Sequence, residues 1–183
     1  TSLFALLFLA HGVTSVRDTG NFDGTILETR RRVREGRLAG PRIFACGPIL
    51  DGDPPFWPAA RVIKNAAEAK AAVAELADQR VDCIKVYDRL SREALAAVHE
   101  EAAAHGLPVI GHVPLAAGFA EARLADVQYL TGIVEPGQKL TRGRVDAIVV
   151  TSLAMHMAHT PTLVFLERVA QLFDANGKYD DSA

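Results

Sequence analysis

Two apolar runs of the sequence each hold one residue that can do chemistry. Lys85 lies inside "VDCIKVYDRLS" (residues 81–91), and His112 lies near the end of "PVIGHV" (residues 108–113). A lysine in such a run either extends its amine out of a strand end or is placed for catalysis or ligand binding. A histidine there is either a core residue that donates to a backbone carbonyl or a metal ligand, because imidazole nitrogen suits zinc.

The run around Lys85 has two faces if it is a strand, because side chains alternate with a period of two. One face carries Ile84 and Val86, and the other carries Cys83, Lys85 and Tyr87. The second face is mixed in character and is not typical of a solvent-exposed face. The competing interpretation is a lysine at a strand terminus that pairs on the surface with Asp82 or Asp88.

The loop "DGDPPFWP" (residues 51–58) follows a predicted strand, and its Trp57 can form a wall of a substrate pocket or simply pack within a rigid loop. The remaining histidines lie at helix ends, on helix surfaces or where a helix passes into a strand. We expect ordinary structural roles for these five: His11, His99, His105, His156 and His159.

Strand and helix patterns alternate along the chain and must position these residues. Six strand-like runs are rich in Val, Ile, Leu or aromatic residues and end in turn residues: 13–18, 42–48, 83–88, 108–113, 127–132 and 159–164. Helical patterns cover 24–36, 65–80, with a capping box at Asn65 and Glu68, and 91–106. Only a brief helix fits within 116–125.

This alternation predicts an α/β fold of parallel βα units in one sheet, organised as a single domain over residues 1–183. A complete eight-stranded (β/α) barrel takes about 250 residues, whereas this chain has 183. We therefore predict a partial (β/α)8 TIM-like barrel whose first and last units are missing.

Composition excludes several classes of partner. The chain is 49% hydrophobic and 23% charged with a formal net charge of −2, which gives no reason to expect nucleic acid or an anionic membrane. Two cysteines, Cys46 and Cys83, are too few for a disulfide framework and favour a reducing, cytoplasmic compartment. The apolar segment "LFALLFLA" is too short to span a bilayer and predicts a buried helix ended by Gly12.

An ordered set of motifs resembles the amidohydrolase superfamily, specifically its imidazolonepropionase-like and Xaa-Pro or Xaa-Arg dipeptidase-like members. The set extends from about Leu7 to about Leu166 and comprises "HGVTSVRDTG", "GPRIFACGPILDGDPPFWP", "VDCIKVYDRLSREALAAVHEEAAAHGLPVIGHVP", "VQYLTG" and "HTPTLV". Lys85 in "IKVY" followed by His112 in "GHV" is its most specific part.

The resemblance implies chemistry for both residues. In that family the lysine at the end of the fourth barrel strand is carboxylated by carbon dioxide, and the carbamate bridges two divalent metals, usually zinc. A free lysine, with a pKa of about 10.4, is a poor ligand, whereas a carbamate is an anionic oxygen ligand. Lys85 as a carbamate and His112 are thus the expected metal ligands.

The sequence departs from the family pattern at three places. The sixth strand usually reads Glu-His-Leu-Thr-Gly, and here Tyr129 stands where the family has a ligating histidine. A phenol is the poorer ligand, although a metal can deprotonate it. The first-strand His-x-His pair and the eighth-strand aspartate are absent, and by position they would fall before Thr1 and after Ala183.

The implied activity is hydrolysis of a C–N amide bond, in a dipeptide-like or cyclic amide substrate, through metal-activated water. Tyr87, Tyr129 and Trp57 are the expected substrate-binding residues. Three alternatives remain: a catalytically inactive barrel fragment that acts only in binding or assembly, an aldolase-like enzyme with Lys85 as Schiff-base lysine, and an intact small α/β binding protein.

Two expectations concern the whole molecule. In barrel enzymes the site lies at the carboxyl ends of the strands, so we expect one cavity to be surrounded by Asp18, Pro48, the 51–58 loop, Lys85, Tyr87, His112, Tyr129 and Thr162. A sheet short of two units leaves unpaired edges, which predicts a homo-oligomer.

Overall fold

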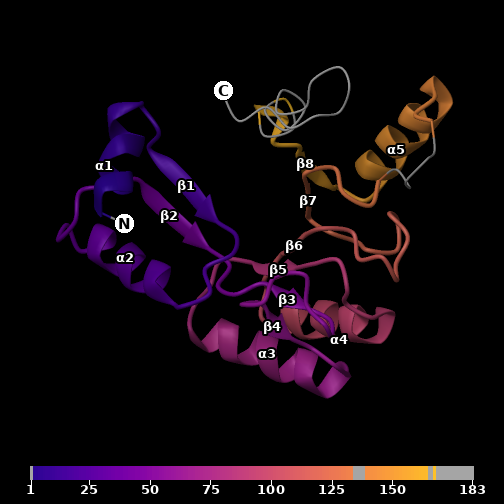
Figure 1. Cartoon of the computed structure of the whole chain (residues 1–183), viewed down its shortest axis with the longest axis horizontal. Helices are drawn as coiled ribbons and strands as arrows, with labels where there is room; N and C mark the ends of the chain where they lie inside the picture. Colours follow the sequence, from indigo (N-terminus) through magenta and orange to yellow (C-terminus); the bar gives the residue numbers. More distant parts are fainter. Residues whose placement is uncertain (1, 134–138, 165–166, 168–183) are drawn as a thin grey trace.

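The computed structural model describes residues 2–133, 139–164 and 167. Its helices are α1 (Ser2–Ala10), α2 (Thr25–Arg34), α3 (Ala66–Asp78), α4 (Arg92–Ala104) and α5 (Arg142–Ala154). Its strands are β1 (Ser15–Asp18), β2 (Arg42–Ala45), β3 (Leu50–Asp51), β4 (Arg61–Val62), β5 (Ile84–Val86), β6 (Val109–Gly111), β7 (Asp126–Gln128) and β8 (Ala158–Thr160). Figure 1 shows the strands arranged along an open arc, from β1 and β2 to β8.

All strand pairs in the described residues are parallel. β1 pairs with β2, and a second sheet runs in the order β4-β3-β5-β6-β7-β8. Asp82, which precedes β5, joins the two sheets: its backbone N–H donates to the Ala45 carbonyl at 2.7 Å, and its carboxylate accepts from the Ala45 N–H at 2.8 Å. The predicted α/β architecture, part of a parallel (β/α) barrel, is confirmed.

Local signals explain the two central helices. The Asn65 side chain accepts from the Glu68 backbone N–H at 2.9 Å, and Glu68 accepts from the Lys64 N–H at 2.9 Å, which is a capping arrangement close to the one predicted. Ser91 caps α4 through the Ala94 N–H. The two helices pack against each other and lie along the strands from β3 to β6 (Figure 1).

The strands present two chemically different faces, as the alternation predicts. One face packs on α3 and α4 in a continuous hydrophobic core that includes Ile84, Val86, Val109, Val127, Val73, Leu76 and Val98. The opposite face carries buried polar side chains on β5 and β7 and just after β6: Lys85, Asp126, Gln128 and His112. Burial of the apolar face stabilises the arc, while the polar face is available for chemistry.

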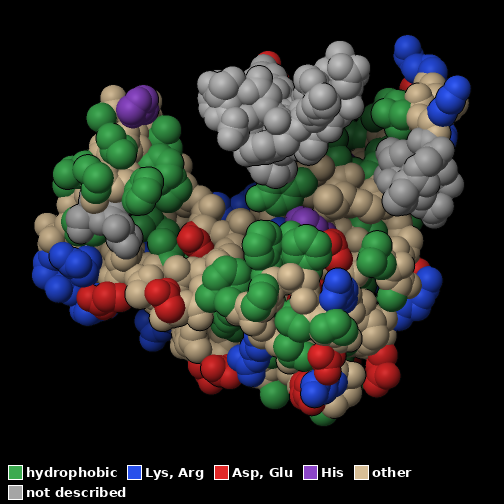
Figure 2. All heavy atoms as spheres, viewed as in Figure 1, with side chains coloured by type: hydrophobic (Ala, Val, Ile, Leu, Met, Phe, Trp, Pro, Cys, Tyr) green, Lys and Arg blue, Asp and Glu red, His purple; other side chains and the backbone are tan. Residues whose placement is uncertain are grey.

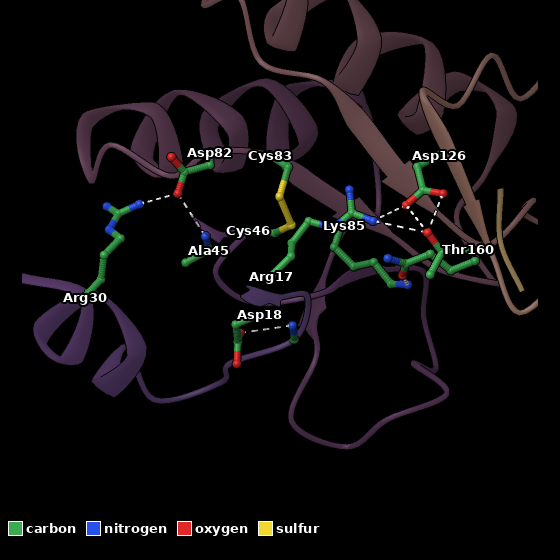
Figure 3. Close-up of a disulfide and its surroundings, with 12 residues drawn as sticks. Arg17, Asp18, Arg30, Ala45, Cys46, Asp82, Cys83, Lys85, Asp126 and Thr160 are labelled. Carbon is green, nitrogen blue, oxygen red and sulfur yellow. Dashed lines mark hydrogen bonds and ion pairs between the residues drawn. A yellow bond between two sulfur atoms is a disulfide. The ribbon is translucent and has the colours of Figure 1, made fainter. Parts of the chain in front are cut away.

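The expectation drawn from cysteine usage needs correction, because Cys46 and Cys83 form a disulfide across 37 residues of sequence (Figure 3). Cys46 directly follows β2, and Cys83 directly precedes β5. Both sulfurs are buried beside Ile110 on the polar face of the sheet. The residues become neighbours only when β2 lies alongside β5, so the bond removes the argument for a reducing compartment.

The predicted helix at the N-terminus exists as α1, but the prediction that it is buried is wrong. Phe4, Leu6 and Leu7 are 66%, 51% and 44% exposed, and only Ala5 is buried among the described residues of the helix. Figure 2 shows hydrophobic side chains gathered over this part of the molecule. The helix is apolar all round, so no packing against one partner can cover it.

Several elements differ from the sequence prediction. The short strands β3 and β4 and the helix α5 were not predicted, and 116–125 forms turns instead of a brief helix. β7 and β8 are shorter than predicted because Tyr129 and Leu130 have φ values of 59° and 60°, and Thr162 has 51°. Residues 165 and 166, at the end of the resembling stretch, lie outside the described residues. No helix of the described part has the length and apolar character needed to cross a membrane.

Candidate active site

A cavity of about 600 Å³ opens at the carboxyl ends of the strands. It brings together all five predicted site residues, which are Trp57, Lys85, Tyr87, His112 and Tyr129. The other lining residues are Thr19, Gly20, Phe22, Ile49, Thr131 and Thr162. The predicted convergence therefore holds for these residues, whereas Asp18 and Pro48 do not line the cavity and their chain neighbours Thr19 and Ile49 do.

Lys85 is buried, with 2% of its surface exposed. It therefore does not form the alternative surface ion pair with Asp82 or Asp88. Asp82 pairs instead with Arg30. The Lys85 Nζ donates to the Gln128 Oε1 across the sheet. Burial lowers the pKa of the amine to about 8, against the opposing effect of Asp126 and Asp88.

Two tyrosine rings flank the Lys85 amine. The Nζ lies 5.6 Å from the centroid of the Tyr87 ring and 5.7 Å from that of Tyr129. Aromatic faces attract a cation at such distances. The ring faces therefore offset part of the cost of burying a charged lysine while leaving the amine at the cavity wall.

His112 owes its position to Gly111, which ends β6. Gly111 has a φ of 138°, and a Cβ there would lie 2.1 Å from the Val86 carbonyl oxygen. Only glycine allows β6 to approach β5 so closely. The next residue then turns its ring onto the polar face, on the strand adjacent to Lys85.

The His112 ring is enclosed by protein. Its Nδ1 lies 2.8 Å from the Asp88 Oδ1, and the Tyr87 ring stacks on it with centroids 3.9 Å apart. The Tyr129 ring meets it edge-on at 5.4 Å. Its Nε2 is buried and has no hydrogen-bond partner among the described residues. His112 therefore does not donate to a backbone carbonyl, as the alternative interpretation required.

Asp51 organises the loop that carries Trp57. Its buried carboxylate accepts from three backbone N–H groups: Gly52 at 2.9 Å, Phe56 at 2.7 Å and Arg89 at 2.7 Å. These bonds tie the loop to the segment that follows β5. Phe56 then packs 5.5 Å from the Tyr87 ring, so Trp57 and Tyr87 line the same side of the cavity.

The surroundings of Tyr87 also change the pKa of its hydroxyl. Burial raises the pKa of its hydroxyl, and a hydrogen bond with the Trp57 side chain partly offsets that increase. The phenol is consequently held neutral and can serve as a hydrogen-bond donor in the cavity.

Sequence reasoning missed a second group of polar residues, which Figure 3 shows. Arg17 from β1 forms an ion pair with Asp126 of β7, and both Asp126 oxygens accept from the Thr160 hydroxyl at 2.9 Å. Gln128 was missed as well, although the alternation in "DVQ" places it on the same face as Asp126. The signal was thus available, but the partners lie on distant strands.

Three histidines outside the cavity make local contacts within the fold. His99 Nε2 lies 2.8 Å from the Ala122 carbonyl, and burial lowers the pKa of its ring. His105 is the C-cap of α4. His159 Nε2 lies 2.8 Å from the Ser152 hydroxyl. None of the three lines the cavity.

The donors in the cavity suit part of a metal site. The unpartnered, buried Nε2 of His112 is what a metal-ligating imidazole requires, and Lys85 lies on the adjacent strand. Within the described ranges, no three His, Cys, Asp or Glu side chains gather as a metal-binding group. The described residues therefore supply some ligands of such a site and not a complete set.

Comparisons with known proteins agree with this architecture. Residues 2–176 match the family model described as the Amidohydrolase family. No curated protein matches the chain. Solved structures do match it, over most of its length.

Three of these structures illustrate the likeness. "AH, Bottromycin amidohydrolase" has 28% sequence identity and a TM-score of 0.71 over 86% of this chain and 37% of that chain. Phenylurea hydrolase B has 26% identity and a TM-score of 0.62, and the match covers 85% of this chain and 43% of that chain. The fold is also similar to that of a Xaa-Pro dipeptidase with bound methionine in the active site. That structure has 19% identity and a TM-score of 0.71, and the match covers 98% of this chain and 50% of that chain. The chain thus spans half or less of these proteins.

Proposed function

Since the chain belongs to the amidohydrolase family, we propose that it serves metal-dependent hydrolysis of a C–N amide bond in a dipeptide-like or cyclic amide substrate. The observation that carries this proposal is the buried His112 Nε2, which has no partner in the described part of the chain and lies in one cavity with Lys85. The similarity to a bottromycin amidohydrolase supports an amide substrate, and a Xaa-Pro dipeptidase shares the fold.

His112 and Lys85 hold the metal in this proposal. Lys85 acts as a carbamate, formed when its neutral amine bonds to the carbon of carbon dioxide and releases one proton. Gln128 suits both forms of Lys85, because its amide oxygen accepts from the amine and its NH₂ group, after rotation, can donate to a carbamate oxygen. Burial of the amine favours the neutral form that reacts.

A divalent metal, which imidazole and carbamate donors suggest is zinc, would lower the pKa of a bound water to about 7. The protein's own residues position the substrate. Trp57 and Tyr87 form an aromatic wall against the apolar part of the substrate, and the Tyr87 hydroxyl donates a hydrogen bond. Tyr129 lies beside both proposed ligands and polarises the substrate carbonyl.

Two proposals concern the whole chain. We propose that residues 1–183 form one domain and that the chain associates with a second copy. Among the described residues, β1 and β8 each pair with one strand only, and unpaired strand edges favour association.

Metal analysis of the purified chain tests the function. Elemental analysis should find zinc in the wild type and a loss of that zinc in His112→Ala and Lys85→Ala. A ¹³C NMR carbamate signal after incubation with ¹³C-bicarbonate should vanish in Lys85→Ala. A wild-type chain that retains a bare amine and no metal after exposure to zinc and bicarbonate would contradict the proposal.

The Schiff-base alternative receives a direct test, since a buried lysine with a lowered pKa also suits that chemistry. Borohydride added in the presence of a carbonyl substrate traps such an adduct as a stable mass increase on Lys85. We expect no trapped adduct. Adduct formation at Lys85 without metal would replace the hydrolase proposal.

A further inference from the structure

The environment of His112 is more specific than metal binding alone requires. The Tyr87 face and the Tyr129 edge enclose the ring, and Asp88 bonds its Nδ1 at 2.8 Å. His112 has 4% of its surface exposed. One nitrogen is thus assigned to a carboxylate, and the other is left without a protein partner in the described residues.

The different surroundings of the two ring nitrogens of His112 decide which of them carries the proton when the imidazole is neutral. A neutral ring carries one N–H and one lone pair, and a carboxylate can only accept. The contact with Asp88 therefore places the proton on Nδ1 and the lone pair on Nε2. The lone pair is the form that binds a metal ion.

Asp88 is itself held in place from both sides. Its backbone carbonyl accepts from the Leu115 N–H at 2.8 Å, which links the segments that follow β5 and β6. Its neighbour Arg89 donates its N–H to Asp51 at 2.7 Å. The carboxylate consequently reaches His112 from an anchored backbone, without the freedom of a mobile loop.

We propose that Asp88 is a positioning residue that holds His112 as the Nδ1–H tautomer and so presents the Nε2 lone pair to the cavity. This deepens the proposed function and rests on it only for the identity of the metal. Asp88 acts through His112, because it does not line the cavity itself. Partners of this kind orient metal-binding histidines and raise their basicity.

The experiment reads the tautomer in the metal-free chain by ¹⁵N NMR of histidine-labelled protein. The His112 signals are assigned with a His112→Gln variant. We expect the Nδ1–H form in the wild type and a shift toward the Nε2–H form in Asp88→Ala. Asp88→Asn should keep the Nδ1–H form, because its amide oxygen still accepts. The exposed Asp146→Asn, on α5, is the matched control and should change nothing.

Zinc binding is the second measurement, by calorimetry on the same proteins. Asp88→Ala should bind zinc about 10- to 100-fold more weakly than the wild type, and Asp88→Asn should lose less affinity. An Nε2–H tautomer in the wild type overturns the inference even if Asp88→Ala does not fold. An unchanged tautomer in a folded Asp88→Ala overturns it as well. A wild type that shows the Nδ1–H form but binds no zinc supports the role of Asp88 and contradicts the proposed function.

Discussion

At the scale of single residues, the polar face of the sheet is built from buried pairs. Lys85 bonds Gln128, His112 bonds Asp88, and Arg17 bonds Asp126. Burying a polar group without a partner costs free energy, and these pairs reduce that cost for the polar face. Lys85 still carries a penalty, since the burial that lowers its pKa also disfavours its charged form in the folded state.

That penalty predicts a dependence of stability on pH. The pKa of Lys85 is lowered from 10.5 to about 8 in the folded chain, so the unfolded chain binds more protons between these values. The contribution of Lys85 to the unfolding free energy should therefore rise from pH 8 to pH 10.5, by up to about 3 kcal/mol. Below pH 8 the full penalty remains.

Urea unfolding of the metal-free chain in carbon dioxide-free buffer measures this effect. Lys85→Met removes the ionisable group, so the wild type should gain stability relative to this variant as the pH rises. Parallel pH profiles for the two proteins would show that Lys85 does not titrate in this range.

At the scale of elements, a few side chains connect loops and strands that are distant in sequence. Asp51 ties the 52–56 segment to Arg89, and the Cys46–Cys83 bond ties β2 to β5. Both connections lie next to cavity residues, since Asp51 holds the loop of Trp57 and Cys83 lies two residues before Lys85. Each connection yields a prediction.

Asp51→Ala leaves three backbone N–H groups without their acceptor. We expect a loss of about 3 kcal/mol in unfolding free energy, since buried donors that lose a charged acceptor are costly. Trp57 is the only tryptophan, so its fluorescence should also shift to the red as the loop loosens. The exposed Asp146→Ala serves as a control and should change neither quantity. Unaltered fluorescence in Asp51→Ala would contradict the role of Asp51 in the loop.

Removing the disulfide should destabilise the fold through the unfolded state. Closing a loop across 37 residues restricts the unfolded chain and contributes about 3–4 kcal/mol in the chain-entropy model. The double variant Cys46→Ala/Cys83→Ala should therefore lose about 3–4 kcal/mol of unfolding free energy. Dithiothreitol should lower the unfolding free energy of the wild type by a similar amount and leave that of the double variant unchanged. Equal stability of the wild type with and without dithiothreitol would count against a stabilising bond.

At the scale of the whole molecule, the described arc leaves apolar surface uncovered. α1 exposes most of its leucine and phenylalanine side chains (Figure 2), and α5 exposes Val149, Val150 and Leu153. Contiguous apolar surface of this kind marks an interaction site or an aggregation hazard. The edges at β1 and β8 add hydrogen-bonding groups to it.

We therefore expect self-association or poor solubility of the isolated chain. Light scattering across a concentration series should show a mass above that of the monomer, and Leu7→Lys on α1 should reduce it. Asp146→Lys, at an already exposed polar position, controls for added positive charge. A well-behaved monomer at high concentration would argue against the proposed second copy.

The local pattern of the sequence determined the alternating elements and the two faces of the strand around Lys85. It also placed Lys85, Tyr87, His112, Tyr129 and Thr162 at the carboxyl ends of strands and Trp57 in a loop that follows a strand, and all six line one cavity. These features follow from period and from parallel topology, which act over a few residues or over a whole βα unit. The capping residues of α3 were also predicted, because a cap forms between residues only three apart in sequence.

Tertiary structure alone decided the partners of those residues. Gln128 beside Lys85, Asp126 beside Arg17 and Cys46 beside Cys83 depend on the order and register of strands that lie far apart in sequence. The exposure of α1 likewise depends on what packs against it, which an evenly apolar helix does not encode. Pairing across a sheet is a property of register, and register is set only when all the strands are in place.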